Sequence, residues 1–216
     1  VTATIEDNYQ AVRPYIGRTQ TVERFEETRI LTNAFLQTHA ALFDERVRNG
    51  KIRECHGDLH LNNICIYNDK IEFFDRIEFN EEFKNIDVLY DLAFLVMDLE
   101  FRGRRDYATL LLNTYIEWSG DYLGARLMPL YLSIRACIRG KVASLLADTP
   151  ELSAEVRQNA VEEASRYFEY ARSRMRPRKG ALLLMSGVSG SGKSTLAREI
   201  AMRCGAIHIR SDALRI

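Results

Sequence analysis

Glycine and proline are scarce in this sequence, and it contains no long apolar run. The 216 residues include 12 Gly and 4 Pro, while 46% of the residues are hydrophobic and 28% are charged. This composition is typical of a folded globular protein and excludes a disordered or collagen-like chain. No stretch approaches the 18 consecutive apolar residues of a membrane-spanning helix, so we expect no contact with a membrane.

The sequence also lacks an excess of charge of either sign. Thirty Lys and Arg residues cancel thirty Asp and Glu residues, so no overall field attracts nucleic acid, and we expect no such partner. The four cysteines lack the close pairs of zinc sites and redox dithiols; they are Cys55, Cys65, Cys137 and Cys204. Because the first residues also lack the pattern of a signal peptide, reduced thiols in a cytoplasmic protein are expected.

One motif indicates a phosphate-binding loop, because residues 187–194 match the pattern G-x-x-x-x-G-K-[ST] in full. The loop consists of Gly187, Val188, Ser189, Gly190, Ser191, Gly192, Lys193 and Ser194. A strand is predicted before it at 181–185 and a helix after it at about 193–203, as in α/β nucleotide-binding domains. Glycines let backbone N–H groups point at phosphate oxygens, and the helix N-terminus adds positive potential. The motif therefore predicts binding of ATP.

The polar residues at the end of this loop have expected roles. Lys193 would reach the β and γ phosphates, Ser194 would ligate Mg²⁺, and Thr195 would contact the α phosphate. With a second strand predicted at 206–209, the segment from about 181 onward resembles the P-loop kinases that include gluconate-kinase-like and polynucleotide-kinase-like proteins. The resemblance implies that Asp212 faces a substrate, and a solvated loop carboxylate is the alternative.

A second set of polar residues lies upstream, in the run His56-Gly-Asp-Leu-His-Leu-Asn-Asn63. Asp58 precedes Asn63 by five residues, and Asp75 follows in an apolar run. In phosphoryl transfer a carboxylate accepts the proton of the attacking hydroxyl, while a carboxamide and a second carboxylate hold Mg²⁺. We assign these roles to Asp58, Asn63 and Asp75, with residues 63–67 and 71–75 predicted as a hairpin.

Other interpretations of this region have less chemical support. His56 and His60 are four residues apart, but Gly57 argues against a helix, and no Cys or Glu completes a zinc set. No G-x-S-x-G elbow supports a Ser/His/Asp hydrolase. We interpret His56 as a structural histidine and assign no role to His60. The alternative that Asp58, Asn63 and Asp75 are simple turn residues remains open.

The loop resembles that of the aminoglycoside phosphotransferase and choline-kinase-like superfamily, which reads H-G-D-x-x-x-x-N. Residues 87–94 resemble the D-x-x-x-D-L-A helix of that superfamily, in which the second carboxylate, here Asp91, braces the catalytic loop. The resemblance covers roughly residues 1–148. It implies ATP and Mg²⁺ as cofactors and transfer of the γ-phosphoryl group to a hydroxyl of a small molecule. It does not identify the acceptor.

The patterns together predict an α+β protein with a mostly helical, protein-kinase-like C-terminal lobe that contains the catalytic-loop hairpin. The start of an α/β P-loop NTPase domain follows. We assign residues 1–174 to the lobe, 175–180 to a linker and 181–216 to a truncated P-loop domain. Helices are predicted at about 21–48, 86–101, 104–118, 127–146 and 150–173. The chain resembles the central portion of bacterial two-part proteins, and it is expected to be a fragment, because no Gly-rich nucleotide flap precedes Thr21.

Two alternatives to a kinase centred on Asp58 remain open. In the first, the kinase-like part is a degenerate scaffold and only the P-loop part is an active kinase. In the second, the protein is an ATP-dependent switch that transfers phosphate only to water.

Overall fold

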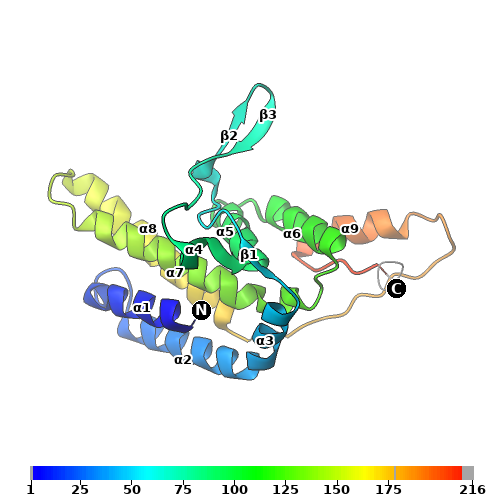
Figure 1. Ribbon diagram of the computed structural model, residues 1–216, viewed down its shortest axis with the longest axis horizontal. Coiled ribbons are helices and arrows are strands. Elements are labelled where there is room, and N and C mark those ends of the chain that lie inside the picture. The colour runs from blue at the N-terminus through cyan, green and yellow to red at the C-terminus, as the bar shows by residue number, and fades with distance from the viewer. Residues whose placement is uncertain (1, 178, 211–216) are drawn as a thin grey trace.

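Most of the chain is helical in the computed structural model, which describes residues 2–177 and 179–210 (Figure 1). Helices α7 (Met128–Ala147) and α8 (Ala154–Met175) pack against each other at its centre. Helix α5 (Val88–Phe101) packs on α7, α2 (Val22–Thr38) packs on α8, and α1 (Thr2–Val12) contacts α7. The prediction of a mostly helical α+β chain is confirmed.

The core lies where these helices meet, because each presents an apolar stripe to its neighbours. Leu89, Ala93 and Met97 repeat every four residues on α5, are fully buried and belong to one cluster with Tyr131 of α7. A small residue lets α7 and α8 approach closely, since a Cβ at Gly140 would lie 2.8 Å from the Phe168 ring. The long helices therefore give the chain a close-packed base on which loops can be fixed.

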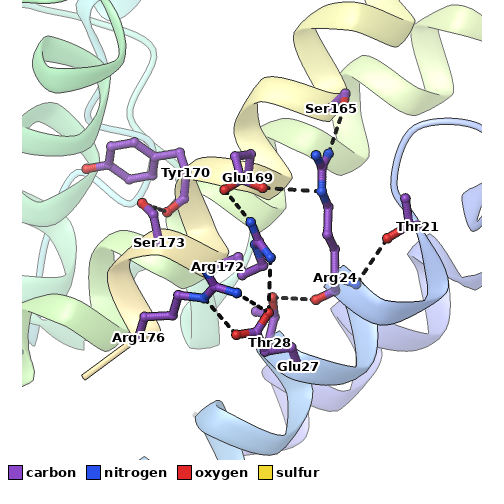
Figure 2. Close-up of polar contacts among 10 residues, drawn as sticks. All are labelled: Thr21, Arg24, Glu27, Thr28, Ser165, Glu169, Tyr170, Arg172, Ser173 and Arg176. Carbon is purple, nitrogen blue, oxygen red and sulfur yellow. Dashed lines mark hydrogen bonds and ion pairs between the residues drawn. The ribbon is translucent and has the colours of Figure 1, made fainter. Parts of the chain in front are cut away.

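Charged side chains also hold α8 to α2, as Figure 2 shows. Arg172 donates to Glu27 at 3.1 Å and to Glu169 at 2.7 Å, and Arg176 donates to Glu27 at 2.7 and 3.0 Å. Arg24 lies 3.2 Å from Glu169. Because these arginines pair with carboxylates, α8 continues past its predicted end at 173 and includes Met175.

The predicted helix over 21–48 and the predicted start of α8 also differ from the structure. The helix predicted over 21–48 is interrupted at His39, which lies outside helical backbone angles and separates α2 from α3 (Ala40–Arg48). Helix α8 starts at Ala154 rather than at Pro150, because the Ser153 side chain accepts a hydrogen bond from the Val156 N–H and caps the helix there. Helix α6 (Arg105–Ser119) lies close to its predicted position.

The predicted hairpin is formed by β2 (Ile64–Tyr67) and β3 (Lys70–Phe73) and projects away from the helices (Figure 1). Its two turn residues, Asn68 and Asp69, have positive φ angles of 48° and 58°, which suits the tight turn of an antiparallel pair. The hairpin begins immediately after the segment 56–63.

A second pair of strands was not predicted from the sequence. Strand β1 (Ile52–Glu54) pairs antiparallel with β4 (Asn85–Asp87), and the short helix α4 (Glu81–Lys84) precedes β4. The pairing brings both ends of the segment 55–84 together, so this segment leaves the helical body and returns to it at one place.

Helix α9 (Lys193–Cys204) confirms the helix predicted after the phosphate loop and lies beside α6 (Figure 1). The strands predicted at 181–185 and 206–209 are wrong for the described residues, which contain no strand in either range. The described part of the chain offers neither segment a strand to pair with, and a strand forms only with a partner. No helix among the described residues is long and apolar enough to cross a bilayer.

Candidate active site

The loop 56–63 between β1 and β2 is fixed by side chains from the core helices α5 and α7. Asp91, in the first turn of α5, accepts hydrogen bonds from the backbone N–H groups of His56 at 3.0 Å and Gly57 at 2.9 Å. Arg135 of α7 donates to the Gly57 carbonyl at 2.9 Å. Gly57 has a φ of 86°, and a Cβ there would lie 2.9 Å from the Phe83 carbonyl oxygen, so this position requires glycine. Asp91 therefore braces the start of the loop.

The far end of the loop is attached to α5 as well. Asp98, which is buried, accepts a hydrogen bond from the Leu61 N–H at 3.0 Å. Arg102 donates to the other oxygen of Asp98 at 3.1 Å and to the Asn62 side chain at 3.1 Å. One helix therefore fixes both ends of the loop, which limits how far the side chains between them can move.

Within the loop, Asp58 and Asn63 are in direct contact. The buried Asn63 side chain donates to the backbone carbonyl of Asp58 at 3.0 Å and to its carboxylate at 3.2 Å. His60 lies 3.3 Å from the same carboxylate, and its ring packs edge-on against Phe94 with centroids 5.2 Å apart.

These neighbours set the charge of Asp58. The hydrogen bond from His60 is the main cause that lowers the pKa of the Asp58 carboxyl below its ordinary value. Partial burial opposes the shift, while the charge of Arg135 and the bond from Asn63 add to it. Asp58 is therefore an ionised carboxylate at neutral pH, as a proton acceptor must be.

Asp75 is held beside the loop through the backbone of its neighbours. The Phe74 N–H donates to the Asn63 carbonyl at 3.1 Å, and the Phe74 carbonyl lies 2.9 Å from Nε2 of His56. The Ile77 N–H donates to the His56 carbonyl at 2.9 Å. Asp75 itself has a φ of 58°, which is uncommon for a non-glycine residue, and its side chain is exposed.

The oxygen donors here fit Mg²⁺ rather than a soft metal ion. The Asn63 NH₂ group is engaged by Asp58, which leaves its amide oxygen as a ligand, and Asp75 adds an exposed carboxylate. Mg²⁺ is usually held by one or two protein side chains together with phosphate oxygens. Within residues 2–177 and 179–210, no three His, Cys, Asp or Glu side chains form a group that would hold a metal.

A cavity of about 420 Å³ opens beside Asp58. Apolar and aromatic side chains of α5 and α7 form part of its wall; they are Tyr90, Phe94, Tyr131, Ile134 and Ile138. Its polar lining includes Arg135, Lys141 and Asn8. This size and this mixture of an apolar wall with a few polar groups are typical of sites for small molecules.

The phosphate loop has the backbone geometry that its glycines predict. Gly187, Gly190 and Gly192 have positive φ angles of 152°, 76° and 81°, and α9 begins immediately after them. The Lys193 ammonium donates to the Val188 carbonyl within the loop. Ser194 and Thr195 are exposed in the first turn of α9, where N–H groups and side chains are available to an anion. Asp212 lies outside the described residues.

Helix α6 contacts the segment that contains the phosphate loop. The Asn113 side chain donates to the Ala206 carbonyl at 2.9 Å and accepts from the His208 N–H at 2.7 Å. Glu117 pairs with Arg198 of α9 at 3.6 Å and with Arg210 at 2.8 Å. The bond from Arg210 lowers the pKa of the Glu117 carboxyl. These contacts were not predicted from the sequence.

Comparison with known proteins supports the phosphate loop. The family described as "AAA domain" matches residues 182–216. This part of the chain is P-loop kinase-like. The match implies nucleotide binding, typically with Mg²⁺, and leaves residues 1–181 outside it.

The chain also has relatives among mycobacterial proteins. It is 34% identical over 187 residues to the uncharacterized proteins Rv2004c and MT2060 of Mycobacterium tuberculosis and Mb2027c of Mycobacterium bovis. The alignment covers 86% of this chain and 36% of each relative, so the chain spans about a third of their length. No solved structure matches the chain.

Two residues at the site were not predicted from the sequence. His60 stands two positions after Asp58, so its proximity was visible, but only the fold shows that its ring turns toward the carboxylate. Arg135 is 78 positions from the carbonyl it binds, and no local pattern signals that contact.

Proposed function

We propose that the protein is an ATP-dependent phosphotransferase that moves the γ-phosphoryl group to a hydroxyl of a small molecule held in the cavity beside Asp58. The observation that carries the proposal is the position of Asp58 at the wall of this cavity, with the Asn63 side chain bound to its carboxylate. The aminoglycoside phosphotransferase-like interpretation of residues 1–174 is part of the proposal, and the bracing of the loop by Asp91 supports it.

In this reaction the bond between the γ phosphorus and the oxygen of ADP breaks as a bond to the acceptor oxygen forms. Asp58 orients the hydroxyl and takes its proton, and ADP leaves. The Asn63 amide oxygen and the Asp75 carboxylate would hold Mg²⁺, which offsets the phosphate charge. Lys193, Ser194 and Thr195 form a second nucleotide site with the backbone of residues 187–192.

The test replaces Asp58 by Asn in the full-length protein. With Mg²⁺, ATP and a bacterial metabolite extract, mass spectrometry should detect a species that gains a phosphoryl group, and Asp58→Asn should lower its rate of formation by at least about 100-fold. Asp69→Asn is the matched control, because it makes the same chemical change at the exposed hairpin turn. It should leave the rate unchanged.

A second candidate function follows from the family match at residues 182–216, in which the P-loop part alone is the active kinase and residues 1–174 are a scaffold. Under that function Lys193→Ala abolishes the product and Asp58→Asn does not. ATP consumption that depends on Lys193, with no phosphorylated product, would instead support an ATP-dependent switch. Loss of the product in Asp58→Asn contradicts both alternatives.

A further inference from the structure

The charges that line the cavity beside Asp58 restrict which acceptor it can hold. Lys141 is half-buried on α7, and its ammonium donates to the Asn8 side-chain oxygen of α1 at 2.7 Å. Asn8 is itself 8% exposed. In the described part of the chain, no carboxylate forms an ion pair with Lys141. The neutral Asn8 side chain orients the ammonium but does not offset its positive charge.

Three carboxylates line the same cavity, and none of them forms an ion pair with Lys141 in the described part of the chain. Buried Asp87 accepts hydrogen bonds from Arg46 at 2.7 Å and from the Tyr131 hydroxyl at 3.0 Å. Asp58 is bound by His60 and Asn63. The remaining one, Glu82 on α4, is exposed, where water screens its charge.

Two aromatic rings of the cavity wall, Tyr90 and Phe94, already lie beneath a cation. The Arg135 guanidinium lies over the Tyr90 ring, 3.9 Å from its centroid, and 4.7 Å from the centroid of Phe94. A quaternary ammonium or protonated amine binds to aromatic faces that are free to receive it. A cation here would meet Lys141 and Arg135, whose charge is partly offset by Asp91 at 3.7 Å. Like charges in a half-buried site repel.

From these contacts, and resting on the phosphotransferase function proposed above, we infer that the acceptor carries an anionic group, a carboxylate or a phosphate, in addition to the hydroxyl. Lys141 binds the anionic group by a charge-assisted hydrogen bond, and Asp58 faces the hydroxyl. Asn8 keeps the Lys141 ammonium on the cavity side. The apolar wall between the two charged ends accommodates the carbon skeleton.

The test separates a bacterial metabolite extract by ion exchange into anionic, neutral and cationic fractions and incubates each with the full-length protein, Mg²⁺ and ATP. The phosphorylated product should form from the anionic fraction. A product from the neutral or cationic fraction alone overturns the inference and leaves the phosphotransferase function standing. If no fraction yields a product, the proposed function fails, and the inference fails with it.

A substitution at Lys141 tests the contact itself with the acceptor found in that fraction. Lys141→Met should raise the KM for the acceptor at least tenfold with little change in kcat, and Lys141→Arg should restore most of the affinity. Lys70→Met on the exposed hairpin is the matched control and should leave both constants unchanged. An unchanged KM in Lys141→Met overturns the inference, and a fall in kcat without the KM effect assigns Lys141 a structural role instead.

Discussion

The hydrogen bond from His60 is the main cause that lowers the pKa of the Asp58 carboxyl, the proposed proton acceptor. A carboxyl with a lowered folded-state pKa stabilises the fold above its unfolded pKa of about 3.9, and this stability is lost as the pH falls through the lower folded value. It also keeps the proton acceptor ionised in mild acid. The acid limb of the rate profile should therefore lie below the ordinary range of an aspartate.

Replacing His60 by Phe should raise the Asp58 pKa, because the hydrogen bond is removed while the ring packing on Phe94 is retained. The pH at which activity falls should move upward in parallel. Carbon-13 NMR titration of the Asp58 carboxyl, alongside the pH-rate profile, measures both. His39→Phe is the control, since His39 stacks on Phe35 away from the loop. An unshifted Asp58 titration in His60→Phe would show that another group lowers this pKa.

At this scale the sequence predicts residue types and order but not contacts through space. Asp58, Asn63 and Asp75 are recognisable by their spacing, and the structure places Asp58 against Asn63 with Asp75 attached by its backbone neighbours. The contribution of Arg135 depends on packing between α5 and α7 and leaves no local signal.

At the scale of the elements, side chains from α3, β4 and the connection before α7 form one buried network of ion pairs. The Arg46 side chain is 3% exposed and binds Asp87 at the start of α5 and Asp121 after α6, the latter at 2.9 and 3.0 Å. The Leu89 N–H also donates to Asp87 and the Gly124 N–H to Asp121. The network therefore positions α5, which in turn holds the catalytic loop.

Arg46→Met should destabilise the protein by about 3–5 kcal/mol, because it leaves the buried Asp87 without its cation and Asp121 with only the more distant Lys51, at 3.8 Å. Urea unfolding followed by circular dichroism measures the free energy of unfolding. Arg104→Met removes an exposed pair with Asp106 and should lower the free energy of unfolding far less, because water screens the pair. Equal losses in the two variants would mean that the Arg46 network contributes no more than a surface pair.

The elements themselves were predicted well where local periodicity determines them. The hairpin, α5, α6, α7 and α9 lie within a few residues of their predicted ranges. Pairing of β1 with β4 joins segments about thirty residues apart, so no local pattern predicted it. The predictions of strands at 181–185 and 206–209 were wrong for a related reason. Both predictions were based on apolar composition, which does not show whether a neighbouring strand is present to pair with.

At the scale of the whole molecule, helix α6 contacts both the helical body and the phosphate-loop segment. Asn113 binds the backbone on both sides of Ile207, and Glu117 binds two arginines of that segment. The site beside Asp58 and the phosphate loop are therefore connected through α6, which also packs on α5. Loosening this contact should affect the phosphate-loop segment without unfolding the core.

Asn113→Ala should remove both hydrogen bonds that the Asn113 side chain makes to the phosphate-loop segment. Such bonds contribute about 0.5–1.5 kcal/mol each, so amide hydrogen exchange in α9 and at His208 should accelerate about tenfold. Exchange in α7 and α8 should not change, because their packing does not involve Asn113. Asn33→Ala on the exposed side of α2 is the matched control. If α9 exchanges at the same rate in Asn113→Ala and in the control, Asn113 does not hold the phosphate-loop segment to α6. The contact must then depend on the Glu117 pairs and on the bond from Arg105 to the Cys204 carbonyl.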